Sequence, residues 1–469
     1  MKRPEMFKTV VKFLILLVML GLEANLANAQ GVSLAKRQQD FVDLRFGMFI
    51  HYNIPTYMDQ DWADPEASPN LFNPKKLNTD QWAKAAKSAN MSYGCLTTKH
   101  HSGFSIWDTK TTDYSVMHSP YKKDVVKAYT ESFRKAGLKV MLYYSILDTH
   151  HKIRPNAITP EKIDFIKAQI TELLTNYGKI DALIIDGWDA PWSRISYDDV
   201  PFEEIYSLIK SIQPECLVMD LNAAKYPAEA LYYTDIKSYE QGAGQHIQKE
   251  SNKLPALSCL PINTAWFWKS DFPKVATKTS DDLVNKILKP LNSAYCNFIL
   301  NVAPNRDGLI DDNALATLKE IGDKWKNEGP LPALPVSAMP IISSNMAKKT
   351  FANSSWSDDM FIMDFANDDS YNTAWISNPT VKEPWYEITF DKVKPVNMIV
   401  VAEKKANIKA YRLEYNENGT WKPIVSGTDP SRIKIHRFNR VWAKKVRILI
   451  DKFDSQVQLA EFQVYNEKI

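Results

Sequence analysis

The chain has 469 residues, which suits two or three domains, and its 45% hydrophobic and 24% charged content is ordinary for a globular protein. Its formal net charge is +3, and removal of residues 1–29, with four basic and two acidic side chains, leaves +1. A charge this small argues against nucleic acid or an anionic membrane as a partner.

The first 29 residues are expected to be a secretory signal peptide. A basic start is followed by the apolar run 13–20 and by an A-x-A cleavage site at 27–29. No cysteine follows the apolar run, so we expect no lipoprotein anchor, and no later run is long enough to insert into a membrane. The sequence therefore predicts a mature chain that starts near Gln30 and is periplasmic or secreted.

Residues 30–334 alternate short apolar runs with amphipathic segments. This alternation indicates a parallel sheet covered by helices. Eight strands in about 300 residues suit a (β/α)8 barrel, with a doubly wound sheet as the alternative. We expect helices at 80–90, 160–174, 280–288 and 313–325, and strands at 45–51, 93–100, 139–145, 180–186, 216–220, 233–239, 266–268 and 297–302.

Polar side chains at the strand ends favour the barrel. Barrel enzymes build their site on the C-terminal face from several strands, whereas an open sheet concentrates it at one switch point. The residues at or just after separate strand ends are His51, His100, Tyr144, Asp186, Glu240 and Asn301. The four cysteines lack a metal-ligand spacing, and we expect buried free thiols.

Residues 335–469 have a different texture after the proline-rich segment 330–335. Short alternating runs separated by turn residues indicate an antiparallel β-sandwich of jelly-roll type. The expected strands are 384–390, 397–401, 411–415, 419–422, 445–450 and 460–465.

Asp186 is the first candidate for catalysis. It closes a run of four apolar residues, where an unpaired carboxylate is costly. One alternative is a capping or turn role, since Gly187 follows directly. Near Trp188, whose ring offers an apolar face to a sugar, Asp186 fits a glycosidase nucleophile.

A retaining glycosidase needs a second carboxyl group about 5–5.5 Å from the nucleophile, protonated in the resting enzyme. Asp235, Glu240 and Glu250 are the candidates on later strands. We favour Glu240, because it ends a predicted strand and precedes a glycine-containing loop that can approach a ligand closely. Asp235 is expected inside the barrel or paired with a lysine, and Glu250 in solvent.

His100 and His101 stand together at the end of the second predicted strand. They could be a structural pair, metal ligands or sugar-binding groups. A metal is disfavoured, because ligating histidines are usually spaced i, i+2 or i, i+4 with a third ligand nearby.

Several motifs together resemble the family 29 glycoside hydrolases, the α-L-fucosidases. They are RFGMFIH at 45–51, LTTKHHSGF at 96–104, WDTKTTDYS at 107–115, GLKVMLYYS at 137–145, IDGW at 185–188 and NFILNVAPNRDG at 297–308. The last third resembles the discoidin-like (F5/8 type C) sandwich that often follows that barrel. The resemblance implies a fucosylated glycan as substrate, a two-carboxylate retaining mechanism and no catalytic cofactor.

The resemblance also implies roles for individual residues. Asp186 would be the nucleophile, and neutral imidazoles would each offer one donor and one acceptor to the sugar. Tyr143 equals Tyr144 by pattern alone. The implied sugar contacts are His51, Asp61, Trp62, His100, His101, Tyr144, Trp188 and Trp268.

The chain departs from the family pattern at the acid/base. One branch of the family carries it in a Pro-Ala-Glu stretch before a Trp-Phe pair, where this chain has Leu257. A leucine cannot donate a proton, so we expect Glu240 to act from a neighbouring loop. The alternatives are an enzyme for a related galacto-configured sugar and a glycan-binding protein with an inactive barrel.

The loop 366–375 resembles the discoidin-type loop that often holds a structural calcium ion. Asp368, Thr373 and Glu461 are the matching positions, and hard oxygen ligands suit Ca²⁺. The alternative is a polar turn with local hydrogen bonds. Nothing in the sequence indicates an oligomeric state.

Overall fold

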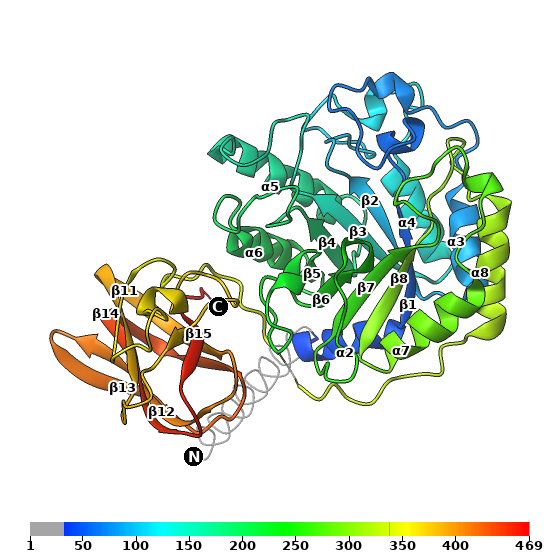
Figure 1. Cartoon of the computed structure of the whole chain (residues 1–469). Coiled ribbons are helices and arrows are strands. Elements are labelled where there is room, and N and C mark those ends of the chain that lie inside the picture. Colours follow the sequence, from blue (N-terminus) through cyan, green and yellow to red (C-terminus); the bar gives the residue numbers. More distant parts are fainter. Residues whose placement is uncertain (1–31, 337, 469) are drawn as a thin grey trace, which may run out of the picture.

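A computed structural model describes residues 32–336 and 338–468 of the chain (Figure 1). The expected signal peptide lies outside the described residues. Within those ranges, no helix combines the length and the apolar character needed to cross a bilayer.

The first domain is an eight-stranded parallel sheet, curved into a TIM-like near-barrel, with helices around it (Figure 1). β1 pairs with both β2 and β8, and the strand order is β5-β4-β3-β2-β1-β8-β7-β6. At the seam between β5 and β6, the Asp235 amide donates to the Val218 carbonyl over 2.7 Å. The bounds are β1 (Phe46–Ile50), β2 (Tyr93–Lys99), β3 (Lys139–Ser145), β4 (Ala182–Asp186), β5 (Leu217–Asp220), β6 (Lys237–Glu240), β7 (Ala256–Pro261) and β8 (Cys296–Asn301). The predicted (β/α)8 architecture is confirmed.

Polar caps start two of the surrounding helices. Asn78 accepts from the Gln81 amide before α3, and Asp124 accepts from the Lys127 amide before α4. The predicted helix at 280–288 is observed as a π-helical turn, Asp282–Leu288, which continues into α7. The helix bounds are α2 (Leu34–Leu44), α3 (Thr79–Ser88), α4 (Val125–Lys135), α5 (Pro160–Thr175), α6 (Phe202–Ile212), α7 (Lys289–Asn292) and α8 (Asp312–Lys324).

The seventh strand differs from the prediction. Residues 266–268 lie in a loop, and β7 is formed by Ala256–Pro261, which pairs with β6 on one side and β8 on the other. The prediction rested on the aromatic residues of 266–268. The structure instead forms the strand from the small and medium side chains of Ala256–Pro261, whose backbone hydrogen-bonds to β6 and β8.

Alternation along each strand divides the barrel residues into two sets. One set fills the interior, including Phe49, Met141, Tyr143, Ile184 and Leu257, and the other packs against the helices. Asp186 follows Ile184 by two residues, and Phe49 precedes His51 by two, so both polar side chains continue the interior rows. All four cysteines are buried and free, as predicted.

The second domain is an antiparallel all-β unit (Figure 1). Its two longest strands, β11 and β14, pair with each other and change register along their length. The first half of β11 also pairs with β9 and its second half with β15, and the strands enclose one hydrophobic core. The predicted strands 384–390 and 397–401 are thus parts of β11. The bounds are β9 (Phe351–Ser354), β10 (Trp375–Ile376), β11 (Trp385–Glu403), β12 (Ile408–Glu417), β13 (Thr420–Gly427), β14 (Ile433–Phe453) and β15 (Gln458–Tyr465).

The two domains are in direct contact. Arg432 forms a two-pronged ion pair with Glu229 of the barrel, and the Tyr232 hydroxyl donates to Gln463 over 2.9 Å. The hydrophobic cluster around the barrel also extends to Met398 and Val400 of β11. The predicted boundary at residue 334 remains a prediction.

Candidate active site

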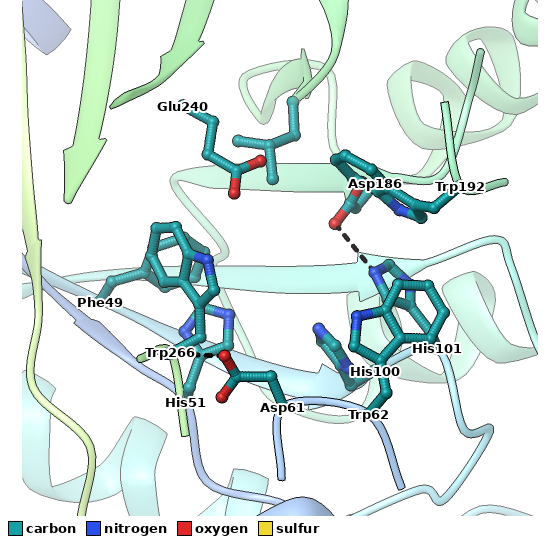
Figure 2. A pocket seen from close by; sticks show the side chains of 11 residues that line it. Phe49, His51, Asp61, Trp62, His100, His101, Asp186, Trp192, Glu240 and Trp266 are labelled. Atoms are coloured by element: carbon teal, nitrogen blue, oxygen red, sulfur yellow. Dashed lines mark hydrogen bonds and ion pairs between the residues drawn. The ribbon is translucent and has the colours of Figure 1, made fainter. Parts of the chain in front are cut away.

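A cavity of about 260 Å³ opens at the C-terminal ends of the barrel strands (Figure 2). This volume is just below the roughly 300 Å³ at which pockets for small ligands begin, so the cavity suits a small ligand of about one sugar ring. Its lining consists of Phe49, His51, Asp61, Trp62, His100, His101, Asp186, Trp192, Leu221, Glu240 and Trp266.

Asp186 ends β4 and its carboxylate is held from two sides. The Tyr143 hydroxyl donates to Oδ2 over 2.6 Å, and Asn222 Nδ2 donates to Oδ1 over 2.9 Å. His101 Nε2 lies 3.6 Å from Oδ2, the oxygen that Figure 2 shows directed toward the cavity. Both oxygens act as acceptors, as those of an ionised carboxylate do.

Glu240 ends β6 and enters the same cavity (Figure 2). Burial raises the pKa of its carboxyl group to about 7, the negative charge of Asp186 adds to the increase, and the nearby Trp266 side chain opposes it. Below pH 7 most molecules therefore carry a protonated Glu240 that can act as an acid.

Three imidazoles surround the cavity in their neutral form. Burial lowers the pKa of His51 to about 4 and holds the pKa of His100 well below its ordinary value. Burial also lowers the pKa of His101, although the charge of Asp186 acts in the opposite direction. Neutral rings can both donate and accept, which suits hydroxyl groups.

Hydrogen bonds behind two of these rings fix their tautomers. Ser145 donates its proton to the Leu147 carbonyl, so its oxygen must accept from Nδ1 of His101 over 2.8 Å. The Asn301 oxygen likewise accepts from Nδ1 of His51 over 2.8 Å. In both rings Nε2 is therefore an acceptor. Nε2 of His101 and Oδ2 of Asp186 are therefore neighbouring acceptors, and a ligand hydroxyl group near them can donate its single proton to one of them.

Three tryptophans form the walls of the cavity. Trp62 and Trp192 are 44% and 38% exposed at its mouth, and the Trp62 ring lies 4.5 Å from that of His101. Asp61 holds the loop that contains Trp266 in place, because its carboxylate accepts hydrogen bonds from the backbone amides of Trp266 (3.4 Å) and Phe267 (3.0 Å).

Most of the predicted site residues come together in this cavity, although their roles remain predictions. The residues that line it as expected are His51, Asp61, Trp62, His100, His101, Asp186 and Glu240.

Tyr144 is a correction, since its side chain is buried outside the barrel. Its hydroxyl donates to Gln169 over 2.8 Å and accepts from Lys99 over 3.0 Å. Strand alternation turns Tyr143 inward instead, onto Asp186. The equal pattern of the two tyrosines is thus resolved in favour of Tyr143.

Trp188 and Trp268 are also absent from the cavity lining. Trp188 is fully buried, and its Nε1 donates to the Val200 carbonyl over 2.8 Å, because the chain turns at Gly187 with φ +108°. Trp268 donates to Asp311 over 2.7 Å in the loop after β7. Trp266 takes the place at the cavity that was expected for Trp268.

The prediction missed several residues around the cavity. Phe49 could have been found, since it lies two residues before His51 on the same strand face. Tyr143 could not be told from Tyr144 by pattern. Asn222 follows β5 in a turn, and no sequence signal marks it as a partner of Asp186.

Leu257 does not leave a gap in the cavity. It lies in β7 among the interior side chains and is 2% exposed. Cys259, two residues later, is the residue that pairs with Glu240. A leucine at this position therefore belongs to the barrel core, below the ring of polar side chains.

Asp368, Thr373 and Glu461 lie close together in the second domain. The Thr373 hydroxyl donates to Asp368, and Glu461 accepts from the amides of Asp369 and Ser370. Burial, together with Asp369 and Asp368, raises the pKa of Glu461 well above its ordinary value. In the described ranges no group of three or more His, Cys, Asp or Glu side chains is arranged to hold a metal. The two carboxyl groups and one hydroxyl group are oxygen ligands of the kind that Ca²⁺ prefers, but three side chains are fewer than the roughly six to eight ligands it takes, and calcium at this loop stays a prediction.

The cavity therefore combines two carboxyl groups in different states. A protonated carboxyl can donate to a leaving oxygen, and an ionised carboxylate can attack or stabilise a positively charged carbon. Neutral imidazoles and aromatic faces suit a hydroxylated ring. This arrangement supports acid-assisted cleavage of a glycosidic bond.

Comparisons with known protein families agree with this chemistry. The family model described as Alpha-L-fucosidase matches residues 23–329, and the model of the F5/8 type C domain matches residues 347–462. Alpha-L-fucosidase 1 of Arabidopsis thaliana is 28% identical over 454 residues, covering 90% of this chain and 85% of that protein. Plasma alpha-L-fucosidase of Homo sapiens is 24% identical, covering 62% of this chain and 68% of that protein.

Solved structures share the fold. Alpha-L-fucosidase isoenzyme 1 from Paenibacillus thiaminolyticus aligns with a TM-score of 0.53 at 23% identity, covering 91% of this chain and all of that one. A family 29 fucosidase from Ruminococcus gnavus, in complex with fucose, aligns with a TM-score of 0.50 at 19% identity, covering 92% and 94%.

Proposed function

The chain belongs to the α-L-fucosidase family of glycoside hydrolases, and from this membership we propose that it removes terminal α-L-fucosyl residues from glycans with net retention of configuration. The natural glycan would be a fucosylated oligosaccharide or glycoconjugate. Glu240 and Asp186 would act as the pair of carboxyl groups that this mechanism requires.

In the first step, the Glu240 proton passes to the glycosidic oxygen while Asp186 attacks the anomeric carbon. The bond from that carbon to the glycosidic oxygen breaks as the bond to Asp186 forms. The products are a fucosyl ester on Asp186, an ionised Glu240 and a glycan that leaves with a free hydroxyl group.

In the second step, the Glu240 carboxylate takes a proton from water, and the water oxygen attacks the same carbon. The bond to Asp186 breaks, which restores its carboxylate and the protonated Glu240. Two inversions at one carbon give net retention.

The observation that carries this proposal is the pairing of Glu240, with its pKa raised to about 7, and Asp186 in one cavity. An acid must hold its proton near the working pH, and burial beside a carboxylate supports that state. The position of Leu257 in the barrel core supports Glu240, rather than this position, as the source of the acid.

We further propose that the three imidazoles bind the sugar hydroxyl groups. Nε2 of His51 and of His101 would accept from them, since Nδ1 of each ring is already engaged. The lining also includes Phe49 and Leu221, whose apolar surface suits the C6 methyl group of fucose. A galacto-configured L-sugar would place a hydroxyl group there, and its desolvation would count against binding.

The test is hydrolysis of p-nitrophenyl α-L-fucoside, with Asp186→Asn as the inactive control and proton NMR to identify the first anomer released. Glu240→Ala should be slow on an unactivated fucoside and regain turnover with azide on the activated one. Release of the opposite anomer, or full activity of Asp186→Asn, would contradict the mechanism. Faster cleavage of the matched α-L-galactoside would reassign the substrate.

Two further proposals concern the rest of the chain. Asp368, Thr373 and Glu461 would help to hold a structural calcium ion, without a part in catalysis. Residues 1–29 would direct export to the periplasm or the medium, with cleavage before Gln30. Mass spectrometry of the N-terminus of the exported protein tests the second proposal, and an uncleaved chain would contradict it.

A further inference from the structure

A chain of hydrogen bonds lies behind Asp186, on the side away from the cavity. Asn222 Nδ2 donates to Oδ1 of Asp186 over 2.9 Å, and the Asn222 backbone amide donates to Oδ1 of Asp220 over 3.0 Å. The Tyr197 hydroxyl donates to the other oxygen of Asp220. Asn222 is 3% exposed and Asp220 is fully buried, so water does not compete for these groups.

The side-chain amide of Asn222 has only one usable orientation. Oδ1 of Asp186 accepts, so the nitrogen of the amide must face it. The amide oxygen of Asn222 is then buried without a hydrogen-bond partner among the described residues. Such an unpaired oxygen lowers stability. The hydrogen bond to Asp186 therefore determines the orientation of the Asn222 side chain, even though its amide oxygen is left unpaired.

The two oxygens of Asp186 have different surroundings. Oδ2 is directed into the cavity beside His101 (Figure 2). Oδ1 accepts the hydrogen bond from Asn222. We infer that Asn222, fixed by Tyr197 and Asp220, is a positioning residue that holds Oδ1 so that Oδ2 attacks the sugar. This inference rests on the proposed function of the cavity.

During the reaction, Oδ2 forms the bond to the anomeric carbon and Oδ1 becomes the carbonyl oxygen of the ester. An ester carbonyl still accepts a hydrogen bond, so the contact with Asn222 persists through both steps. It prevents rotation of the carboxylate, which would exchange the two oxygens. The contact with Asn222 therefore raises the rate by orienting the carboxylate, and this effect should be the same for every leaving group.

The support continues into the domain interface. The Tyr197 ring stacks on Tyr233 with centroids 3.8 Å apart and planes at 9°. The Tyr233 amide in turn donates to the Ile341 carbonyl over 2.8 Å, beyond the proline-rich segment. The contacts that begin at Asn222 thus reach residues at the junction of the two domains.

Kinetics of Asn222→Ala separate positioning from acid catalysis. We expect kcat to fall by about ten- to one-hundred-fold, with KM nearly unchanged, both for p-nitrophenyl α-L-fucoside and for an unactivated fucosyl disaccharide. Glu240→Ala should slow the unactivated substrate far more than the activated one. Asn297→Ala is the matched control, because Asn297 is an equally buried barrel asparagine whose two bonds, to Tyr93 and Phe41, lie at the barrel floor. It should lose stability and keep kcat.

Crystal structures of the same variants judge the positioning without relying on activity. In Asn222→Ala the Asp186 carboxylate should rotate or take more than one orientation, and in Asn297→Ala it should stay in place. An unchanged carboxylate in Asn222→Ala, or a kcat equal to that of the wild type, would overturn the inference. A wild-type enzyme that cleaves no α-L-fucoside would instead overturn the proposed function.

Tyr197→Phe keeps the ring stack and removes only the hydroxyl group, so it serves if Asn222→Ala does not fold. It should lower kcat in the same way but less, by about three- to ten-fold, and disturb the same carboxylate in the crystal. Tyr197→Phe should also add nothing to the kcat loss of Asn222→Ala. Fully multiplicative losses would show that Tyr197 does not act through Asn222 and would overturn this part.

Discussion

The hydroxyl group of Tyr143 donates a 2.6 Å hydrogen bond to Oδ2 of Asp186, whereas Tyr144, the next residue of β3, points out of the barrel to Gln169. Two adjacent and chemically identical side chains therefore have separate surroundings. One touches the proposed nucleophile, and the other joins a buried polar network with Lys99.

This pair gives a matched test of the cavity. Tyr143→Phe should lower kcat by about ten- to one-hundred-fold, because it removes a hydrogen bond to a charged oxygen that takes part in the reaction. Tyr144→Phe removes a hydroxyl of equal burial, so it should lower the melting temperature and leave kcat within about two-fold. Steady-state kinetics and thermal unfolding of both variants provide the comparison. Equal kcat losses in the two would contradict the assignment.

The pH dependence should report the proton on Glu240. Burial raises the pKa of this carboxyl group, so the folded enzyme keeps the acid form up to about pH 7. The value of kcat/KM should therefore fall as the pH rises through about 7. For Glu240→Gln this alkaline limb should disappear, and a wild-type profile that stays flat from pH 6 to pH 9 would count against Glu240 as the acid.

Trp266 should shift that limb in a defined direction. The Trp266 side chain stabilises the Glu240 carboxylate and lowers its pKa, so Trp266→Phe should move the alkaline limb of kcat/KM to higher pH. The matched substitution Trp268→Phe lies in the same loop but contacts Asp311, so the limb should stay where it is. A shift toward lower pH in Trp266→Phe would refute this reading of the contact.

Calcium should act on stability without acting on turnover. We expect added Ca²⁺ to raise the melting temperature, and a chelator to lower it, because the ion would bind the folded loop around Asp368 and Glu461 only. Asp368→Asn should abolish this response. Asp429→Asn changes a half-buried aspartate elsewhere in the same domain and serves as the control. A chelator effect on initial rates below the melting temperature would contradict a purely structural role.

The architecture of the barrel could largely be predicted from the sequence, because buried parallel strands require apolar runs between amphipathic helices. The seventh strand could not, since Ala256–Pro261 carries little of the usual β-strand signal and its hydrogen-bond partners lie on β6 and β8. The error also led to Trp268 rather than Trp266 as the cavity tryptophan.

The site divides in the same way. Strand ends predicted the region and four of the residues that line it, His51, His100, Asp186 and Glu240, because carboxyl ends of parallel strands meet on one face. The other three, Asp61, Trp62 and His101, were expected as sugar contacts only through the family resemblance. Which of Tyr143 and Tyr144 points into the barrel depends on a shift of one residue along the strand, and the sequence pattern does not determine it. Trp188 depends on the backbone turn at Gly187, and Asn222 on a loop whose path only the folded chain determines.

The four free thiols lie within the wall of the barrel, and none is accessible in the folded chain. Folding of this enzyme therefore requires no oxidation step, so the same native state can form in a reducing compartment as in an oxidising one. A thiol reagent reaches these sulfur atoms only when the barrel opens. The rate at which the four cysteines are modified therefore reports how often the barrel opens.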